Sequence, residues 1–107
     1  MKNISLVKFS FKPNMKNNWL DWCEELKNRS DEVYATLSNE GAKIEACFIS
    51  EKEDACYYLM CADDVGKALE LSEKSELPID REHREVFQKS LAYIEKCKPL
   101  FFFERDV

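Results

Sequence analysis

Three features of the sequence predict an α+β fold. Segments with alternating apolar residues and segments with helical periodicity follow one another in the order strand, helix, strand, strand, helix, strand. The polar segment 51–54 separates the two middle strands, as the turn of a β-hairpin does. Two glycines and three prolines in 107 residues leave little room for linkers, so we expect a single domain over residues 1–107.

The N-terminal part is expected to form one strand and one long helix. Residues 4–11 predict the strand, because apolar side chains line both of its faces in alternation. Pro13 ends this strand, and Asn14 is positioned to cap the helix that follows. The helix has a candidate break at 28–31 and a suitable stop at Gly41. Its expected buried residues recur at helical spacing and are Trp19, Trp22, Cys23, Leu26, Val33 and Leu37.

The middle of the chain is expected to form a hairpin and a short helix. Apolar residues at every second position predict strands at 42–50 and 55–61. Asp63 or Asp64 is positioned to cap the next helix, since a carboxylate can accept a hydrogen bond from a free backbone N–H of the first turn. The side chains expected to face inward on this helix are Val65, Ala68, Leu69 and Ser72.

The C-terminal part is expected to add a helix and a last strand. The helix is predicted to start at Asp80, and Pro99 to end this segment. Its expected buried stripe consists of Val86, Phe87, Leu91 and Ile94. Residues 100–103 predict the final strand. The complete set of elements predicts a ferredoxin-like fold, with a four-stranded antiparallel sheet and helices on one face.

Both faces of the predicted sheet are apolar. Ile44 and Phe48 face one way, and Cys47 and Ile49 face the other. An antiparallel sheet with one face in water should alternate apolar and polar residues instead. A bare second face would expose a larger apolar patch than monomers usually carry, so we expect a homodimer of the dimeric α+β barrel type. The alternative is that the extra helix covers this face.

Composition and charge argue against several classes of protein. The net charge of −5 is spread along the chain without a basic stripe, so no nucleic-acid partner is expected. No apolar run approaches a membrane span, and the N-terminus lacks the apolar core of a signal peptide, so no membrane partner is expected. The five cysteines lack a C-x-x-C pair. Without such a pair, we expect no metal site and no other cofactor. The cysteines are expected to be reduced, which indicates a cytoplasmic protein.

The segment 75–83 is the strongest indication of a functional site, because it holds the single histidine, His83. His83 follows Asp80 by three residues and shares a helix face with Val86 and Phe87, so it should point toward the sheet. The positive end of the helix dipole disfavours imidazolium, which leaves a neutral ring suited to accept a proton or bind a ligand. The competing interpretation is a structural histidine that hydrogen-bonds a strand carbonyl.

Three further residues are candidates to share a site with His83. Glu45 lies among apolar residues on its strand face, where burial would raise its pKa and suit it to acid or base catalysis. Tyr58 on the next strand can bring a hydroxyl into the same cavity, and Arg81 can hold an anionic group. The alternatives are an edge position or a salt bridge to Arg81 or Lys43 for Glu45, and a surface position for Arg81.

A distinctive set of residues consists of Trp19 and Trp22, the segments 32–41 and 57–58, and the sequence Pro-Ile-Asp-x-x-His at 78–83. In these residues the chain resembles a family of small bacterial proteins that has no established activity. The resemblance covers nearly the whole chain. It implies a dimeric α+β barrel. More distantly, the fold is similar to that of rhamnose mutarotases and cofactor-free antibiotic-biosynthesis monooxygenases, which hold a ligand between helices and sheet or inside the barrel.

These features favour a small cofactor-free enzyme of the isomerase or mutarotase kind that acts on a small polar metabolite. His83 would be the acid or base, Glu45 its partner, and Tyr58 and Arg81 the groups that orient the ligand. One alternative is a non-catalytic ligand-binding dimer, in which His83 and Glu45 tie helix to sheet. The other is a protein-interaction module that uses exposed aromatic residues. The link to mutarotases is an analogy of fold alone.

Overall fold

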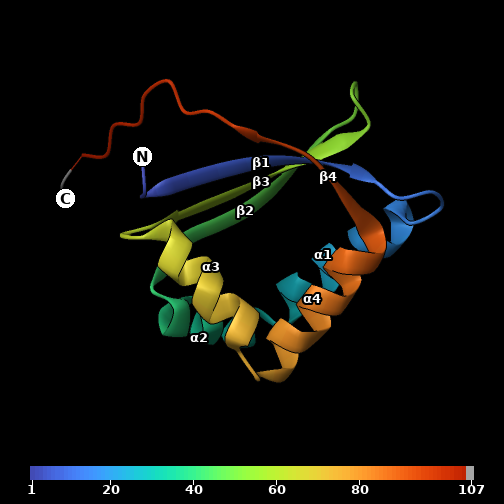
Figure 1. Ribbon diagram of the computed structural model, residues 1–107. Helices are drawn as coiled ribbons and strands as arrows, with labels where there is room; N and C mark the ends of the chain where they lie inside the picture. The colour runs from blue at the N-terminus through green and yellow to red at the C-terminus, as the bar shows by residue number, and fades with distance from the viewer. Residues whose placement is uncertain (106–107) are drawn as a thin grey trace.

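A computed structural model describes residues 1–105, and the last two positions of the predicted domain lie outside the described residues. This part of the chain forms a four-stranded antiparallel sheet with its four helices on one face (Figure 1). The predicted α+β class and ferredoxin-like sheet are confirmed. The elements are β1 (Ile4–Phe11), α1 (Lys16–Asn28), α2 (Ser30–Glu40), β2 (Ala42–Ser50), β3 (Ala55–Ala62), α3 (Val65–Lys74), α4 (Pro78–Ser90) and β4 (Leu91–Cys97).

The register of the sheet decides which side chains face the helices. The strand order is β2-β3-β1-β4, and both neighbours of β3 are antiparallel to it. Tyr58 in β3 lies between Val7 of β1 and Cys47 of β2, and Met60 lies in the same way between Ser5 and Glu45. Because side chains alternate along each strand, this row shares the face on which the helices pack.

Local signals place most helix ends where the sequence predicts them. The break at 28–31 is confirmed, since α1 ends at Asn28 and α2 begins at Ser30. Gly41 ends α2 with a φ of 73°, a left-handed conformation that glycine adopts without strain. Asp64, and not Asp63, caps α3 by accepting a hydrogen bond from the backbone N–H of Lys67 at 3.1 Å.

The start of α4 differs from the prediction. The helix begins at Pro78, and Asp80 lies inside its first turn instead of capping it. Proline suits the first helical position, because its fixed φ matches the helix. A backbone N–H at this position would have no partner inside the helix, so its absence costs nothing. Asp80 is buried in this position.

The prediction for the C-terminal segment is wrong in two respects. The helix stops at Ser90, so Leu91 and Ile94 lie in strand β4, and residues 100–103 do not form a strand. β4 pairs with β1, whose Phe11 lies opposite Leu91. The free edge of β1 offers backbone hydrogen bonds to a segment rich in apolar and aromatic residues, and this long-range pairing outweighs the local helical spacing.

The apolar core between sheet and helices has two parts. The larger cluster contains both tryptophans and lies under α1 and α4; its buried members are Phe9, Trp19, Trp22, Cys56, Ile79 and Leu91. A smaller cluster lies under α3 and consists of Met60, Ala62, Val65 and Ala68. Since α3 and α4 belong to different clusters, the space between them is not filled by a continuous core.

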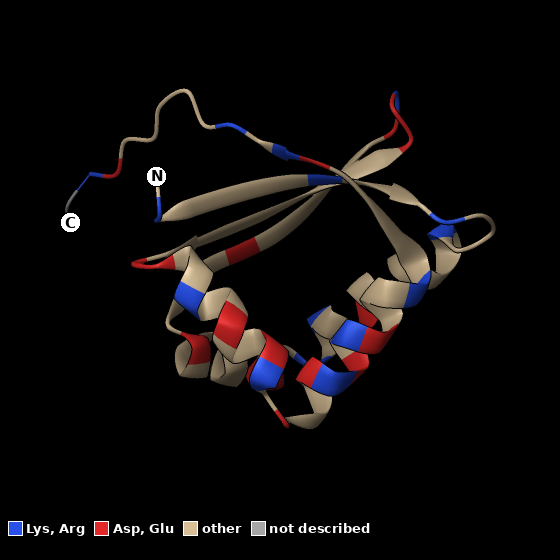
Figure 2. Cartoon of the chain, in the orientation of Figure 1, with Lys and Arg blue, Asp and Glu red and all other residues tan. Residues whose placement is uncertain are grey.

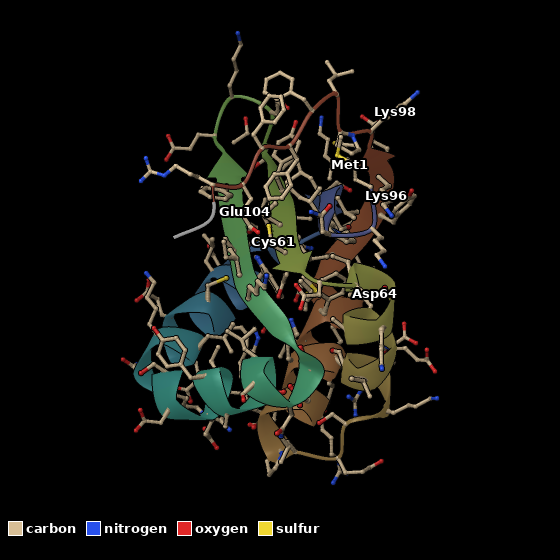
Figure 3. All side chains as sticks on the ribbon, turned by 90° about the vertical axis from the view of Figure 1, so that its left-hand side faces the viewer. Met1, Cys61, Asp64, Lys96, Lys98 and Glu104 are labelled. Carbon is tan, nitrogen blue, oxygen red and sulfur yellow. The ribbon has the colours of Figure 1, made fainter. Side chains whose placement is uncertain are left out.

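The second face of the sheet is not covered by any helix of the described chain, which rules out cover by an extra helix. Ile44 and Phe48 are 49% and 58% exposed on this face. The extended tail after β4 crosses part of it and brings Glu104 beside Cys61 (Figure 3). The tail itself exposes Leu100, Phe101 and Phe103. This face therefore remains largely apolar and accessible.

Candidate functional site

A cavity of about 360 Å³ lies between the sheet and helices α3 and α4. Its apolar lining comes from Val7, Phe9, Met60, Leu69 and Phe87. Its polar lining comes from Ser5, Glu45, Tyr58, Ser72, Glu73, His83, Arg84 and Gln88. Apolar walls with a few converging polar groups are typical of small-molecule sites.

Four side chains from four elements form one hydrogen-bonded chain at this cavity. The indole Nε1 of Trp22 in α1 lies 2.8 Å from Nδ1 of His83 in α4. The Nε2 of His83 lies 3.0 Å from the hydroxyl of Tyr58 in β3. That hydroxyl lies 2.9 Å from Oε2 of Glu45 in β2. The chain therefore connects the core helices to a carboxyl group on the sheet.

The chemistry of the donors gives this chain one direction. An indole nitrogen can only donate, so Nδ1 of His83 must accept from Trp22. A neutral imidazole then carries its proton on Nε2 and donates to the oxygen of Tyr58. The hydroxyl of Tyr58 is left to donate to Glu45. A second proton on His83 would point at the N–H of Trp22, so the imidazolium form is disfavoured by geometry as well as by burial.

The pKa values follow from the same surroundings. Burial lowers the pKa of His83 to about 4, so the ring is neutral at physiological pH. Burial also raises the pKa of Glu45, although the hydrogen bond from Tyr58 opposes this. The pKa of Tyr58 lies well above its usual value, because the hydroxyl is buried beside a carboxylate. Of these three groups, Glu45 is the one whose pKa is shifted toward neutral pH, which suits it to exchange a proton.

A second polar cluster lies beside this chain and contains two buried carboxyl groups. The hydroxyl oxygen of Thr36 lies 2.6 Å from Oδ2 of Asp80 and 3.2 Å from Oε1 of Glu40. Its single proton goes to the closer Asp80, which Ser75 also hydrogen-bonds. The oxygen of Thr36 can then accept a hydrogen bond from a protonated Glu40. A protonated Glu40 agrees with its pKa, which burial and the charges of Glu45 and Asp80 raise to about 7.

Glu40→Gln is expected to stabilise the protein at pH 8 and to have little effect at pH 5. The folded protein holds the Glu40 proton up to about pH 7, whereas an unfolded chain releases it near 4.5. Ionisation therefore costs stability above pH 7, and no cost remains below the unfolded pKa. At ~1.4 kcal/mol per pKa unit, the shift from 4.5 to about 7 corresponds to a gain of about 3 kcal/mol.

Urea unfolding at both pH values measures this gain, with the exposed Glu25→Gln as the control that should not change stability at either pH. An equal or lower stability of Glu40→Gln at pH 8 would contradict the assignment of a buried, protonated Glu40.

The structure brings together three of the four residues that the sequence analysis singled out. Glu45, Tyr58 and His83 line one cavity, whereas Arg81 is exposed and does not line it. Both ring nitrogens of His83 bond to side chains and not to a strand carbonyl. Lys43, offered as a salt-bridge partner of Glu45, pairs with Asp63 at 2.8 Å.

Two residues of the site were missed from the sequence. Arg84 lines the cavity and donates to the carbonyls of Ser72 at 2.8 Å and Ser75 at 2.9 Å, which joins α4 to the end of α3. Its place next to His83 was the available signal. Trp22 was assigned to core packing, and the structure shows that it also holds His83. A buried indole N–H needs an acceptor, and this need was the signal for Trp22.

The surroundings of the cavity carry charges of both signs. Acidic and basic residues are interspersed along the helices, and the strands carry few (Figure 2). Within residues 1–105, no group of three or more His, Cys, Asp or Glu side chains is placed to hold a metal ion. No helix in that range is long and apolar enough to cross a membrane.

Comparison with known families assigns nearly the whole described chain. A model of a family of unknown function, DUF6176, matches residues 2–103. The chain belongs to DUF6176. The match extends from β1 into the tail after β4, so all site residues of this DUF6176 protein lie inside it. No curated protein matches the chain. The predicted resemblance to a family without established activity is confirmed.

Proposed function

We propose that the protein is a cofactor-free acid–base enzyme of the isomerase kind that acts on a small polar metabolite. The observation that carries this proposal is the directed chain Trp22–His83–Tyr58–Glu45, which ends on a buried carboxyl group in the cavity wall. A carboxyl with a raised pKa beside a hydroxyl is a common pairing for proton transfer. The five free cysteines support a reducing, cytoplasmic setting.

Each group has a different role in the proposed reaction. Glu45 takes a proton from a substrate O–H, or from a C–H beside a carbonyl, and returns it to another atom of the same molecule. An oxygen of the substrate replaces Glu45 as the acceptor of the Tyr58 hydroxyl, which frees the carboxylate to act as base. His83 has no free nitrogen, so we assign it as a positioning residue that holds Tyr58 by the bond from Nε2.

The proposed substrate class follows from the cavity walls. Glu45 and Glu73 both line the cavity, and the donors of Arg84 that face Ser72 and Ser75 are already bonded to their carbonyls. This balance disfavours anions and favours neutral molecules with hydroxyl or carbonyl groups. Sugars that interconvert between anomers belong to this class, since ring opening needs one base and one acid. Fold analogy to mutarotases points to the same reaction.

The test is exchange spectroscopy by NMR on a panel of neutral monosaccharides that includes L-rhamnose, D-glucose and D-ribose. Saturation transfer between the two anomeric protons reports interconversion, and deuterium uptake from D₂O by small ketones reports C–H exchange. The wild-type protein should accelerate one of these processes above the buffer rate. Buffer rates for the whole panel, without any shift of the Trp22 indole or His83 ring signals, would refute the proposed enzyme.

A non-catalytic ligand-binding role is the second candidate, and one observation favours it. Both nitrogens of His83 are engaged, so the ring ties α1 and α4 to the sheet as a structural element would. A ligand that shifts the His83 and Trp22 signals without anomeric or deuterium exchange would support this role over catalysis.

We also propose that two copies associate through the open face of the sheet. The exposed Ile44 and Phe48, together with Phe101 and Phe103 of the tail, support this dimer, because such an apolar face is unusual for a monomer. The opposite face carries the helices and the cavity, so each copy would keep its own site accessible.

Phe48→Glu is expected to convert a dimer into a monomer, because a charge at the centre of an apolar contact is left without a partner. Light scattering should give twice the 12.6 kDa chain mass for the wild type and the single mass for the variant. Tyr34→Glu is the matched control, since Tyr34 is a similarly exposed aromatic residue on α2. A monomeric wild type, or a Phe48→Glu variant that stays dimeric, would contradict this interface.

A further inference from the structure

A second cavity, of about 410 Å³, lies on the other side of Glu45 and Tyr58. It opens between β2 and the helices α1 and α2, and two of its lining residues are Cys23 and Cys47. A third cysteine, Cys56, is buried beside it, with 1% of its surface exposed. The proposed function uses none of these thiols.

The sheet register brings two of the thiols together. Cys47 lies opposite Tyr58, and Ile49 lies opposite Cys56, so Cys47 and Cys56 are diagonal neighbours on the helix-covered face of β2 and β3. The side chains of Cys47 and Cys56 are close enough to affect each other's pKa. Of the five cysteines, all within the described residues, Cys47 alone is exposed.

The two sulfurs have different chemical characters. The neighbouring side chains of Cys56 and Trp19 lower the pKa of Cys47, although partial burial of its sulfur and the charge of Glu45 act in the opposite direction. The Cys47 side chain and burial raise the pKa of Cys56. Burial raises the pKa of Cys23 to about 11. Cys47 is therefore the exposed member of the pair, with the lowered pKa, and Cys56 is its buried neighbour, with the raised pKa.

We propose that Cys47 and Cys56 form a redox-active thiol pair that reacts with peroxides. The Cys47 thiolate attacks one oxygen of hydrogen peroxide, the O–O bond breaks, and hydroxide leaves, so that Cys47 becomes a sulfenic acid. The Cys56 sulfur then attacks the Cys47 sulfur; the S–S bond forms, the S–O bond breaks, and water leaves with the Cys56 proton. Peroxide is the oxidant, and the two cysteines are oxidised together by two electrons.

This inference is independent of the proposed function, although the two sites share a wall. Glu45 and Tyr58 line both cavities, and Cys47 is two residues from Glu45 on the same strand face. A disulfide between β2 and β3 would form directly beside the Tyr58–Glu45 hydrogen bond. Oxidation of the pair can therefore be measured whether or not the first cavity is catalytic.

The test treats the reduced protein with one equivalent of hydrogen peroxide and analyses intact mass and linked peptides. Loss of two hydrogen atoms and a Cys47–Cys56 linkage are expected. Cys61→Ser is the matched control. Trypsin leaves Cys56 and Cys61 on one peptide, so this variant ensures that the linked cysteine is Cys56. Cys61 lies on the opposite face of the sheet and is not expected to take part. The same disulfide should form in Cys61→Ser at the wild-type rate.

Two variants separate the roles of the thiols. Cys56→Ser should stop at a Cys47 sulfenic acid that dimedone traps, and Cys47→Ser should not react with one equivalent of peroxide. In the wild type, iodoacetamide should modify Cys47 at least about tenfold faster than the half-buried Cys97, a readout that needs no variant to fold. A first disulfide to Cys23, oxidation of Cys47→Ser at the wild-type rate, or equal alkylation of Cys47 and Cys97 would overturn the proposal.

Discussion

Glu45→Gln is expected to reduce the proposed proton-transfer rate by about 10²–10⁴-fold, the usual contribution of a positioned acid or base. In the wild type the Tyr58 hydroxyl lies 2.9 Å from Oε2 of Glu45. The amide oxygen of glutamine can accept the same hydrogen bond, so the fold and the hydrogen bonds that connect Tyr58 to His83 should persist. The amide has no basic oxygen at neutral pH, so it cannot take a proton from a substrate. The anomeric or deuterium exchange assay measures the loss directly.

Two further variants test whether this loss is specific to the carboxylate of Glu45. Glu73→Gln is the matched control, because Glu73 lines the same cavity and is not part of the hydrogen-bonded chain. Tyr58→Phe should lower the rate while leaving Glu45 ionisable, so the rate should still fall as the pH drops and Glu45 takes up its proton. A Glu45→Gln variant that is folded and exchanges substrate protons as fast as Glu73→Gln would remove Glu45 from the proposed chemistry.

The stability that His83 contributes is expected to fall by about 3 kcal/mol between pH 7 and pH 4. An unfolded chain binds the histidine proton below its ordinary pKa of 6.5, whereas the folded protein resists it down to about pH 4. Stability is therefore lost as the pH falls through this window, at ~1.4 kcal/mol per unit. The raised pKa values of Glu40 and Glu45 act in the opposite direction, so the measurement has to be a difference.

His83→Gln supplies that difference, because glutamine stays neutral and can both donate and accept a hydrogen bond. The free energy of unfolding of the wild type minus that of His83→Gln should decrease from pH 7 to pH 4. In a separate check, the single histidine gives one set of ring signals by NMR, which should titrate near pH 4. Trp22→Phe removes the indole donor and should raise this pKa. Titration of the wild-type ring near 6.5 would contradict a buried, neutral His83.

The fold was predictable where local signals and long-range contacts agree. The strand 4–11, the hairpin around 51–54 and the stop at Gly41 each have one backbone conformation that suits both their own residues and their neighbours in the sheet. The C-terminal segment is the exception. Leu91 and Ile94 fit a helical stripe as well as a strand, and the free edge of β1 decides in favour of β4.

The site was predictable to the extent that it depends on which face a residue occupies. Alternation along the strands places Glu45 and Tyr58 on the inner face, and helical spacing places His83 against it. The same reasoning could not choose between Arg81 and Arg84. That choice depends on where α4 starts and on the carbonyl oxygens of the α3–α4 connection that receive the guanidinium.

The sequence by itself determined the class of fold, the inward faces of its elements and the residue types available for proton transfer. Only the tertiary structure decided how these residues are connected. Trp22 lies 61 positions from His83 in the sequence, and its indole N–H occupies Nδ1 of His83. His83 therefore donates from Nε2 to Tyr58, and Tyr58 donates to Glu45, which is the last acceptor of the series. Hydrogen-bond direction depends on partners brought together by packing, and no periodicity along one segment encodes it.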